Sequence, residues 1–164
     1  MQKRAYLSLG SNVGDRQKNL SEAIRSLESV GTVLAVSSFY ETEPVEFTAQ
    51  EWFLNCAVAL ETDKTPSDLL HFILQIEQSM GRQRLQDKGP RNIDIDILLY
   101  GDSVVELEDL TIPHPAMHER RFVLEPLVEI AADAQHPIRR KTAKQLLDAL
   151  PAGQIVLKSG GRKA

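Results

Sequence analysis

The chain has 164 residues and a formal net charge of −4 at pH 7. This length can bury the core of one domain without disulfides or structural metals, and 42% hydrophobic with 26% charged residues exclude an intrinsically disordered chain. The acidic balance argues against a general nucleic-acid binder, and no apolar run approaches the roughly 20 residues of a membrane-spanning helix. We expect a cytosolic protein whose single domain covers residues 1–157, followed by a flexible tail at residues 158–164.

The first 40 residues predict a strand, a helix and a second strand. Residues 5–9 alternate in polarity as strands do, and the Gly-Ser-Asn sequence at 10–12 is typical of a turn. Asp15 is suited to cap a helix, whose apolar residues recur at helical spacing until Gly31. The second strand is expected at residues 33–40.

A long connection, residues 41–52, leads to a third predicted strand at residues 53–60. Connections of this length are often lids over a site. Thr65 followed by Pro66 supplies a capping side chain and then a proline at the first helical position. This pair predicts a second helix, which Gly81 ends.

An arginine-rich loop at residues 82–91 precedes a fourth predicted strand at residues 93–100. The resulting order βαββαβ is typical of the ferredoxin-like arrangement, an α+β fold in which both helices cover one face of an antiparallel sheet. C-terminal additions follow, and they include an amphipathic segment at residues 142–150. We therefore expect a ferredoxin-like core with C-terminal additions.

Two carboxylates on the fourth predicted strand are candidate metal ligands. Asp94 and Asp96 are two residues apart, so both side chains leave the same face with Cα atoms about 6.5–7 Å apart. The apolar residues around them are expected to point toward the helices: Ile93, Ile95, Ile97 and Leu99. Like charges this close favour a shared cation, and a pair of Mg²⁺ ions is the arrangement used in phosphoryl chemistry. The alternative is a pair of solvated carboxylates.

Positively charged residues lie close to this strand in the sequence. Arg82, Arg84 and Arg91 belong to the preceding loop, and guanidinium groups bind phosphate oxygens through two hydrogen bonds at once. Each arginine taken alone is explained better by solubility. His114 lies between two prolines, whose restrained backbone suits a fixed phosphate donor, with a turn histidine as the alternative. The sequence has no Gly-x-x-x-x-Gly-Lys-[Ser/Thr] loop, so phosphate binding must depend on arginine, histidine and metal.

These segments resemble the 6-hydroxymethyl-7,8-dihydropterin pyrophosphokinase family from the first strand to about Ile130. The matching pieces are Leu9–Asn12, Ser37–Thr42, Phe53–Val58, Ile76–Glu77, Gly81–Arg82, Gly89–Leu98, Pro113–His114 and Arg120–Phe122. The run from Gly89 to Leu98 is the most specific of them. The resemblance implies the ferredoxin-like fold and the transfer of the pyrophosphoryl group of ATP to the hydroxymethyl oxygen of the pterin, with release of AMP, in folate biosynthesis.

The same resemblance implies ligands and the residues that hold them. ATP is a co-substrate, and two Mg²⁺ ions that bridge its phosphates would be bound by Asp94 and Asp96. Arg82 and Arg91 would neutralise the transferred group, and Arg84, His114 and Arg120 would hold phosphate oxygens. The pterin would be held by Thr42, Pro44, Val45, Phe53, Asn55 and Phe122.

Phe53 and Asn55 agree with this on physical grounds, because residues two apart on a strand share a face and can present a ring beside an amide. Taken alone, Phe53 would be assigned to the core. Lys88 is a departure from the family, many of whose members have an aromatic residue before the Gly-Pro pair. This departure leaves the role of Arg84 open.

Two other classes of function compete with the enzyme. An RNA-binding ferredoxin-like module is disfavoured by the net charge and by the missing strand aromatics. A non-catalytic domain that binds a nucleotide is disfavoured by the intact set Arg82, Arg91, Asp94 and Asp96. We expect a monomer whose partners are ATP and the hydroxymethyl-dihydropterin, without a nucleic-acid or membrane partner.

Overall fold

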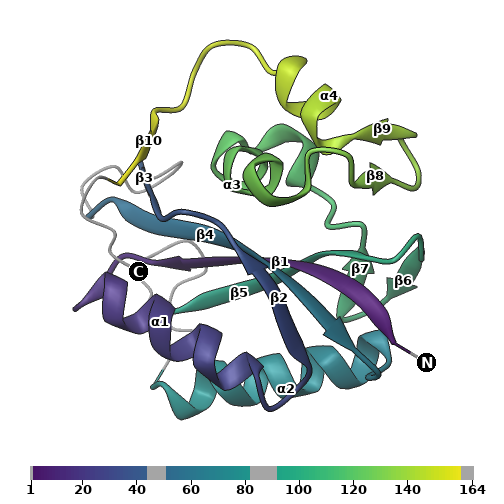
Figure 1. Ribbon diagram of the computed structural model, residues 1–164. Coiled ribbons are helices and arrows are strands. Elements are labelled where there is room, and N and C mark those ends of the chain that lie inside the picture. Colours follow the sequence, from purple (N-terminus) through teal and green to yellow (C-terminus); the bar gives the residue numbers. More distant parts are fainter. Residues whose placement is uncertain (1, 44–50, 82–91, 160–164) are drawn as a thin grey trace.

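A six-stranded antiparallel sheet forms the centre of the protein (Figure 1). The computed structural model describes residues 2–43, 51–81 and 92–159. The strands of this sheet are β1 (Lys3–Ser11), β2 (Thr32–Val36), β3 (Tyr40–Thr42), β4 (Phe53–Thr62), β5 (Asp94–Tyr100) and β10 (Val156–Lys158). They run in the order β10-β3-β4-β1-β5, and β2 pairs with β4 on the same edge as β3.

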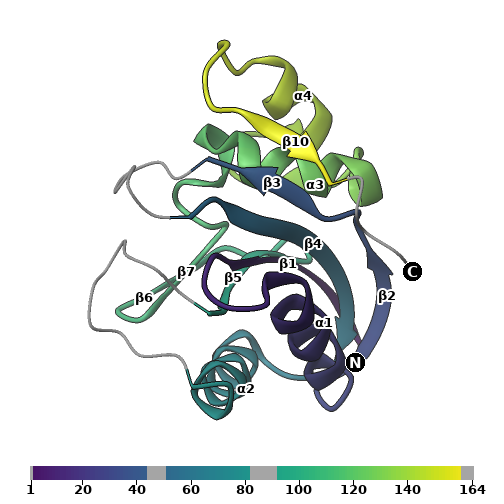
Figure 2. The same ribbon diagram turned by 90° about the vertical axis from the view of Figure 1, so that its left-hand side faces the viewer.

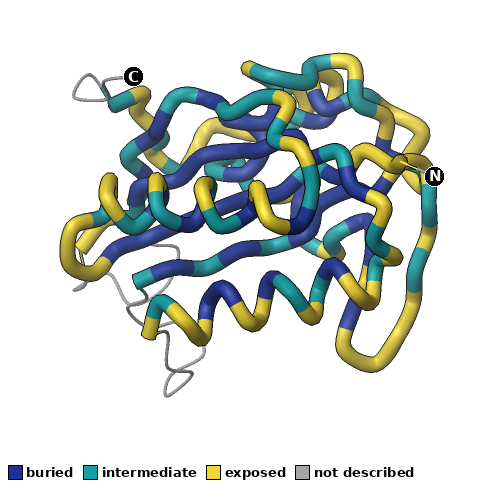
Figure 3. Tube along the Cα trace, turned by 60° about the horizontal axis from the view of Figure 1, so that its bottom comes forward, coloured by how far each residue is buried: buried dark blue, intermediate teal, exposed yellow. Residues whose placement is uncertain are grey.

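Two helices, α1 (Arg16–Leu27) and α2 (Pro66–Ser79), cover one face of the sheet (Figure 2). The predicted caps are both present: the Asp15 side chain accepts from the Lys18 N–H at 3.1 Å, and the Thr65 hydroxyl accepts from the Asp68 N–H at 3.2 Å. Between the helices and the sheet lies the larger core. Figure 3 shows long buried stretches along the central strands. The strand order β5-β1-β4-β2 with both helices on one face confirms the ferredoxin-like prediction.

The opposite face carries the C-terminal part of the chain, which adds a second core. The elements on this face are the 3-10 helix η1 (Met117–Glu119), α3 (Arg121–Ala131), the hairpin β8 (Gln135–His136) and β9 (Lys141–Thr142), and α4 (Ala143–Asp148). The hairpin β6 (Val105–Leu107) and β7 (Leu110–Ile112) precedes them and contacts β5, and its residues Val105, Leu110 and Ile112 join the larger core instead. The amphipathic segment predicted at 142–150 is confirmed as α4, which begins with a capping box formed by Thr142 and Gln145. Helix α3 was not predicted from the sequence, because Pro126 obscures a helical pattern that packing against β4 stabilises.

The strand predicted at residues 33–40 is two strands, β2 and β3, separated at residues 37–39. Ser37 causes the break: its N–H donates to the Ala57 carbonyl at 2.9 Å, while its hydroxyl accepts from the Ala57 N–H at 2.9 Å. A side-chain oxygen thus takes the place of a backbone acceptor. The chain can leave the edge of β4 and rejoin it with β3 without an unpaired group at Ala57.

A bulge in β5 corrects the predicted direction of one side chain. Leu7 pairs with Ile97, but Tyr6 pairs with Leu99, so Leu98 is an extra residue on β5. Each residue beyond the bulge therefore points to the opposite face from the one that strict alternation predicts. Leu99, expected to point toward α1 and α2, is buried with α3 and α4 instead.

Strand β10 lies on the outer edge of the sheet next to β3. Of the segment predicted as a tail, Lys158 is the last residue of β10, and the Ser159 N–H donates to the Phe39 carbonyl at 2.7 Å. Residues 160–164 lie outside the described part of the chain. Within that part, no helix combines the length and the apolar character that crossing a membrane requires.

Candidate functional site

The sheet face opposite α1 and α2 brings the predicted polar residues into rows. Gly10 lies within β1, not in a turn as predicted, and it pairs with Asn55 on one side and with Asp94 on the other. Neighbouring strands are about 4.8 Å apart, so Asn55 and Asp94 are about 10 Å apart across Gly10. Asp96 lies in the next row, where it pairs with Ser8.

Asp94 and Asp96 leave β5 on this open face and are half-buried, whereas Ile95 between them is 5% exposed and packs in the core with α1 and α2. The predicted common face of the two carboxylates is therefore present. Among the described residues, no group of three or more His, Cys, Asp or Glu side chains is placed to hold a metal ion. Asp94 and Asp96 can thus supply part of a ligand set, with bound phosphates and water as the source of the remainder.

The α2 residue Glu77 contacts β5 next to the two carboxylates, a contact that sequence reasoning missed. Its side chain is 3% exposed, and its carboxylate accepts from the Ile95 backbone N–H at 2.8 Å. That N–H lies between Asp94 and Asp96 on the outer edge of β5. The hydrogen bond therefore holds the backbone from which both carboxylates project.

Asn55 and Thr42 form the most enclosed polar pair on the open face. They are 3% and 1% exposed, and the Asn55 amide nitrogen donates to the Thr42 hydroxyl at 2.5 Å. A methyl group at Gly10 would lie 2.4 Å from the Asn55 Oδ1 and 3.4 Å from the Phe53 ring. Gly10 therefore leaves the space in which the predicted amide and ring lie side by side.

The start of α3 brings further predicted residues to the same side of the sheet. Phe122 is half-buried against the core that α3 forms with Ala57 of β4. The Arg120 guanidinium lies 5.6 Å from the centre of the Phe122 ring, within the range of a cation–π contact. One short segment thus offers an aromatic face and a positive charge together.

His114 is attached to the outer edge of β5, because its backbone N–H donates to the Leu98 carbonyl at 3.0 Å. Its Nδ1 accepts from the Ala116 N–H at 3.1 Å, so the neutral ring carries its proton on Nε2. Burial and the nearby Arg120 lower the pKa of His114 to about 4, and attraction to Asp94 opposes them only in part. At neutral pH the ring is therefore uncharged and has one N–H to donate.

The remaining predicted site residues lie outside the described part of the chain. They are Pro44, Val45, Arg82, Arg84 and Arg91, together with the departure at Lys88. Their roles stay predictions. The described residues that the fold brings to the open face are Thr42, Phe53, Asn55, Asp94 and Asp96, with His114, Arg120 and Phe122 beside them.

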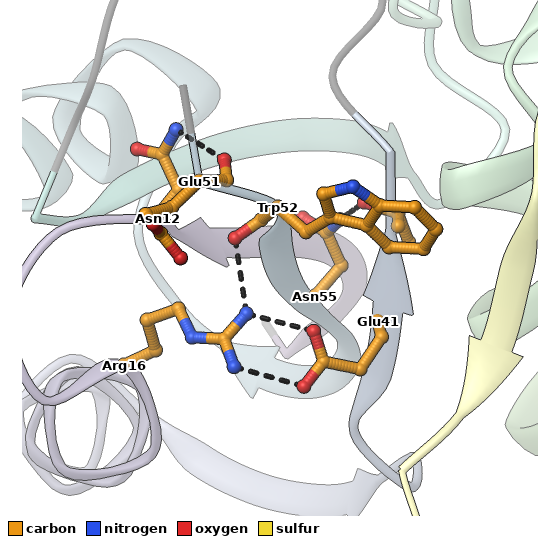
Figure 4. Close-up of polar contacts among 7 residues, drawn as sticks. Asn12, Arg16, Glu41, Glu51, Trp52 and Asn55 are labelled. Carbon is orange, nitrogen blue, oxygen red and sulfur yellow. Dashed lines mark hydrogen bonds and ion pairs between the residues drawn. The ribbon is translucent and has the colours of Figure 1, made fainter. Parts of the chain in front are cut away.

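A polar cluster behind this face was also missed. We call it the Arg16 cluster: Asn12, Arg16, Glu41, Glu51 and Trp52 (Figure 4). Arg16 contacts residues 25 and 36 positions further along the chain. No periodicity relates residues so far apart, so only the tertiary structure shows the cluster.

A family model described as 7,8-dihydro-6-hydroxymethylpterin-pyrophosphokinase (HPPK) matches residues 6–132. The folic acid synthesis protein fol1 of Schizosaccharomyces pombe is 45% identical over 159 residues, which are 96% of this chain and 22% of that protein. The 2-amino-4-hydroxy-6-hydroxymethyldihydropteridine pyrophosphokinase of Bacillus subtilis is 47% identical over 133 residues, 80% of each chain. The chain thus spans about a fifth of the fission-yeast protein and most of the bacterial one.

The fold is similar to that of solved structures with little sequence identity. The crystal structure of wild-type HPPK-DHPS from Plasmodium falciparum has a TM-score of 0.73 at 17% identity, over 90% of this chain and 44% of that one. A second structure of that protein, with pterin and p-hydroxybenzoate, has a TM-score of 0.72 at 19% identity, over 90% and 42%. At this identity the similarity concerns the fold.

The lowered pKa of His114 predicts a pH dependence of stability for the metal-free protein. The folded pKa of about 4 is below the ordinary value of 6.5, so the unfolded state binds more protons between these values. The free energy of unfolding should therefore fall as the pH drops from 6.5 to 4. His114→Asn keeps an acceptor for Ala116 but does not titrate, and it should reduce this slope by up to about 1.4 kcal/mol per pH unit.

Urea unfolding at several pH values between 4 and 7.5 measures the slope for both proteins. The His136 pKa is also lowered, chiefly by burial, and this histidine remains in the variant, so some slope should persist. Identical slopes for the wild type and His114→Asn would contradict the assignment of a neutral, half-buried His114.

Proposed function

The chain belongs to the 7,8-dihydro-6-hydroxymethylpterin-pyrophosphokinase family, and on that premise we propose that it transfers the pyrophosphoryl group of ATP to the hydroxymethyl oxygen of 6-hydroxymethyl-7,8-dihydropterin. The products are the pterin diphosphate and AMP, and the reaction serves folate biosynthesis in the cytosol. The observation that supports the proposal is the row Asn55–Gly10–Asp94, in which an enclosed amide lies on the same face as Asp94, with Asp96 in the next row.

The pterin end of the row suits a flat ring with a polar edge. The Asn55 amide nitrogen already donates to Thr42, which leaves its other N–H and its carbonyl oxygen to a ring edge that has both donors and acceptors. Phe53 lies beside the amide over Gly10, and Phe122 lies on α3 above the same strands. A ring bound here would stack on aromatic faces while its edge is read by Asn55.

The other end of the row suits phosphate groups. Arg120 supplies a positive charge, and neutral His114 supplies one hydrogen-bond donor at a defined nitrogen. Arg82, Arg84 and Arg91 would add charge from the loop that precedes β5. A neutral His114 binds phosphate oxygens without repelling Arg120, so the two groups can contact one phosphate chain.

Asp94 and Asp96 would hold Mg²⁺, because hard carboxylate oxygens on one face are the ligands this cation prefers. When bound, two Mg²⁺ ions would neutralise the phosphate oxygens and orient the β-phosphorus of ATP. The protein residues need no covalent intermediate. Their task is to hold the hydroxymethyl oxygen in line with the β-phosphorus and to exclude water, and positioning of this kind supplies much of the rate in phosphoryl transfer.

Replacing either carboxylate tests this assignment. In Asp94→Asn or Asp96→Asn the amide is a poorer ligand for Mg²⁺, and AMP formation should fall by at least about 100-fold, or about 2.7 kcal/mol in the barrier. The change also removes a like-charge repulsion, so thermal melting of the metal-free variants is measured beside the activity to show that they are folded. Mg²⁺ with a non-hydrolysable ATP analogue should raise the melting temperature of the wild type more than that of the variants.

Asp109→Asn is the control, because Asp109 is an exposed acidic residue in the turn between β6 and β7. It should leave both the activity and the analogue-induced stabilisation unchanged. Near-normal AMP formation by Asp94→Asn or Asp96→Asn would sink the two-metal assignment.

Asn55→Ala and Phe122→Ala should weaken pterin binding far more than ATP binding, because edge recognition and stacking belong to the pterin. Each loss should be about 1–3 kcal/mol, the cost of a lost aromatic contact or of unpaired polar groups. Calorimetric titration of each ligand separately gives the two affinities. Phe72→Ala is the control, since Phe72 is a half-buried aromatic residue of α2 on the other side of the sheet. Equal losses for both ligands in Asn55→Ala would show that Asn55 only supports the fold.

A further inference from the structure

We propose that Arg16 is a positioning residue for the pterin end of the site, although it lies on the opposite side of the sheet. Its guanidinium holds β3 and the start of β4 in the arrangement that Thr42, Phe53 and Asn55 require. The inference rests on the proposed function, because it names the pterin as the ligand whose binding depends on Arg16. No contact between Arg16 and either substrate is part of it.

The contacts of Arg16 join three parts of the chain (Figure 4). Its Nη1 and Nη2 donate to the two carboxylate oxygens of Glu41, each at 2.8 Å, and Nη1 also donates to the Trp52 carbonyl at 3.0 Å. Glu41 belongs to β3, and Trp52 immediately precedes β4. One planar group of α1 therefore joins Glu41 of β3, the strand that carries Thr42, to the residue that precedes β4, the strand that carries Asn55.

The register shows that this contact acts from behind the site. Glu41 pairs with Leu54, which is buried in the core with α1 and α2, so the Glu41 side chain leaves β3 on that side. Thr42 pairs with Phe53, and both point to the open face. The guanidinium thus holds the residues directly next to Thr42 and Phe53 without occupying the space in which a ligand would bind.

Hydrogen bonds of Asn12 and of Asn19, which lies outside the Arg16 cluster, hold the residues around the start of α1. The Asn12 amide donates to the Glu51 carbonyl at 3.1 Å, a second tie from the end of β1 to the residues that lead into β4. The Asn19 amide donates to the Ser11 hydroxyl at 3.1 Å and to the Val13 carbonyl at 2.9 Å, which braces the turn between β1 and α1. These hydrogen bonds therefore hold both the start of the helix that carries Arg16 and the residues that Arg16 contacts.

The contacts of Arg16 with Glu41 and Trp52 require the shape of a guanidinium group and not only a positive charge. The hydrogen bonding of the guanidinium to the Glu41 carboxylate, followed by the attraction of Glu41 and Glu51, raises the pKa of Arg16 against the opposing effect of burial, so the group stays cationic at every working pH. Lysine is also cationic, but its ammonium cannot match both carboxylate oxygens in parallel and reach the Trp52 carbonyl as well. Arg16→Lys should therefore keep the alignment of β3 with the start of β4 only in part.

The test compares the affinities of Arg16→Gln, Glu41→Gln and Arg16→Lys for 6-hydroxymethyl-7,8-dihydropterin and for a non-hydrolysable ATP analogue with Mg²⁺. We expect a pterin Kd about tenfold weaker in Arg16→Gln and Glu41→Gln, an intermediate value in Arg16→Lys, and analogue Kd values within about twofold of the wild type. The double variant Arg16→Gln/Glu41→Gln should bind the pterin no more weakly than Arg16→Gln alone, since either single change already removes the ion pair between the two residues. Arg25→Gln, an exposed arginine of the same helix, is the matched control and should bind like the wild type.

Several outcomes would overturn the inference. Wild-type pterin affinity in both Gln variants would show that the contact does not align the site, and equal losses for pterin and analogue would show a merely structural role. If Arg16→Gln fails to fold, Glu41→Gln and Arg16→Lys still give the comparison. A wild-type protein that binds no pterin would refute the proposed function itself, whereas a wild-type protein that binds it while the Gln variants bind it equally would refute only the role of Arg16.

Discussion

Strand β1 makes antiparallel pairs with β4 along one edge and with β5 along the other, and the rest of the structure depends on this double pairing. It brings residues more than 35 positions apart in the sequence, Asn55 and Asp94, into one row with Gly10 between them. Because Gly10 has no side chain, the Asn55 amide can lie over the backbone of β1. A larger residue at this position would displace the Asn55 amide.

The two faces of the sheet carry different kinds of contact. One face packs on α1 and α2, and it carries the contacts that hold backbone positions: Glu77 on Ile95 and Arg16 on Glu41. The other face presents the polar side chains, with α3 above part of it. In each case a charged side chain of a helix holds a strand one residue away from a site residue. Hydrogen bonds from the helix side thus reach residues next to Asp94, Asp96 and Thr42, in addition to the hydrogen bond that Asn55 donates to Thr42 on the open face.

Much of the core could be predicted from local patterns. The caps at Asp15 and Thr65, the order of the first strands and helices and the common face of Asp94 and Asp96 depend on residues close in sequence, and the structure has them all. The predictions failed where a tertiary contact overrides the pattern. Ser37 breaks a predicted strand because its hydroxyl bonds the backbone of β4, and the extra residue Leu98 turns Leu99 to the other face.

Fewer features of the candidate site than of the core could be predicted from local sequence patterns. Gly10 was assigned to a turn from its composition, although its pairing with two strands makes it the centre of the row. Arg16 could not be connected to Glu41 or Trp52 at all, because salt bridges between distant residues leave no periodicity in a sequence. The flanking prolines and the resemblance to a family both indicated His114, and the resemblance assigned roles to Arg120 and Phe122. The approach of Arg120 and Phe122 to the open face depends on α3, a helix that its pattern concealed.

Product analysis is the most direct measurement of the central claim that one face binds both the pterin and the phosphates of ATP. The protein is incubated with ATP and Mg²⁺, with and without 6-hydroxymethyl-7,8-dihydropterin, and the nucleotides are separated by chromatography. We expect AMP to form in step with the pterin diphosphate, no AMP without the pterin, and no accumulation of ADP. Formation of ADP in place of AMP, or of AMP at the same rate without the pterin, would contradict the claim.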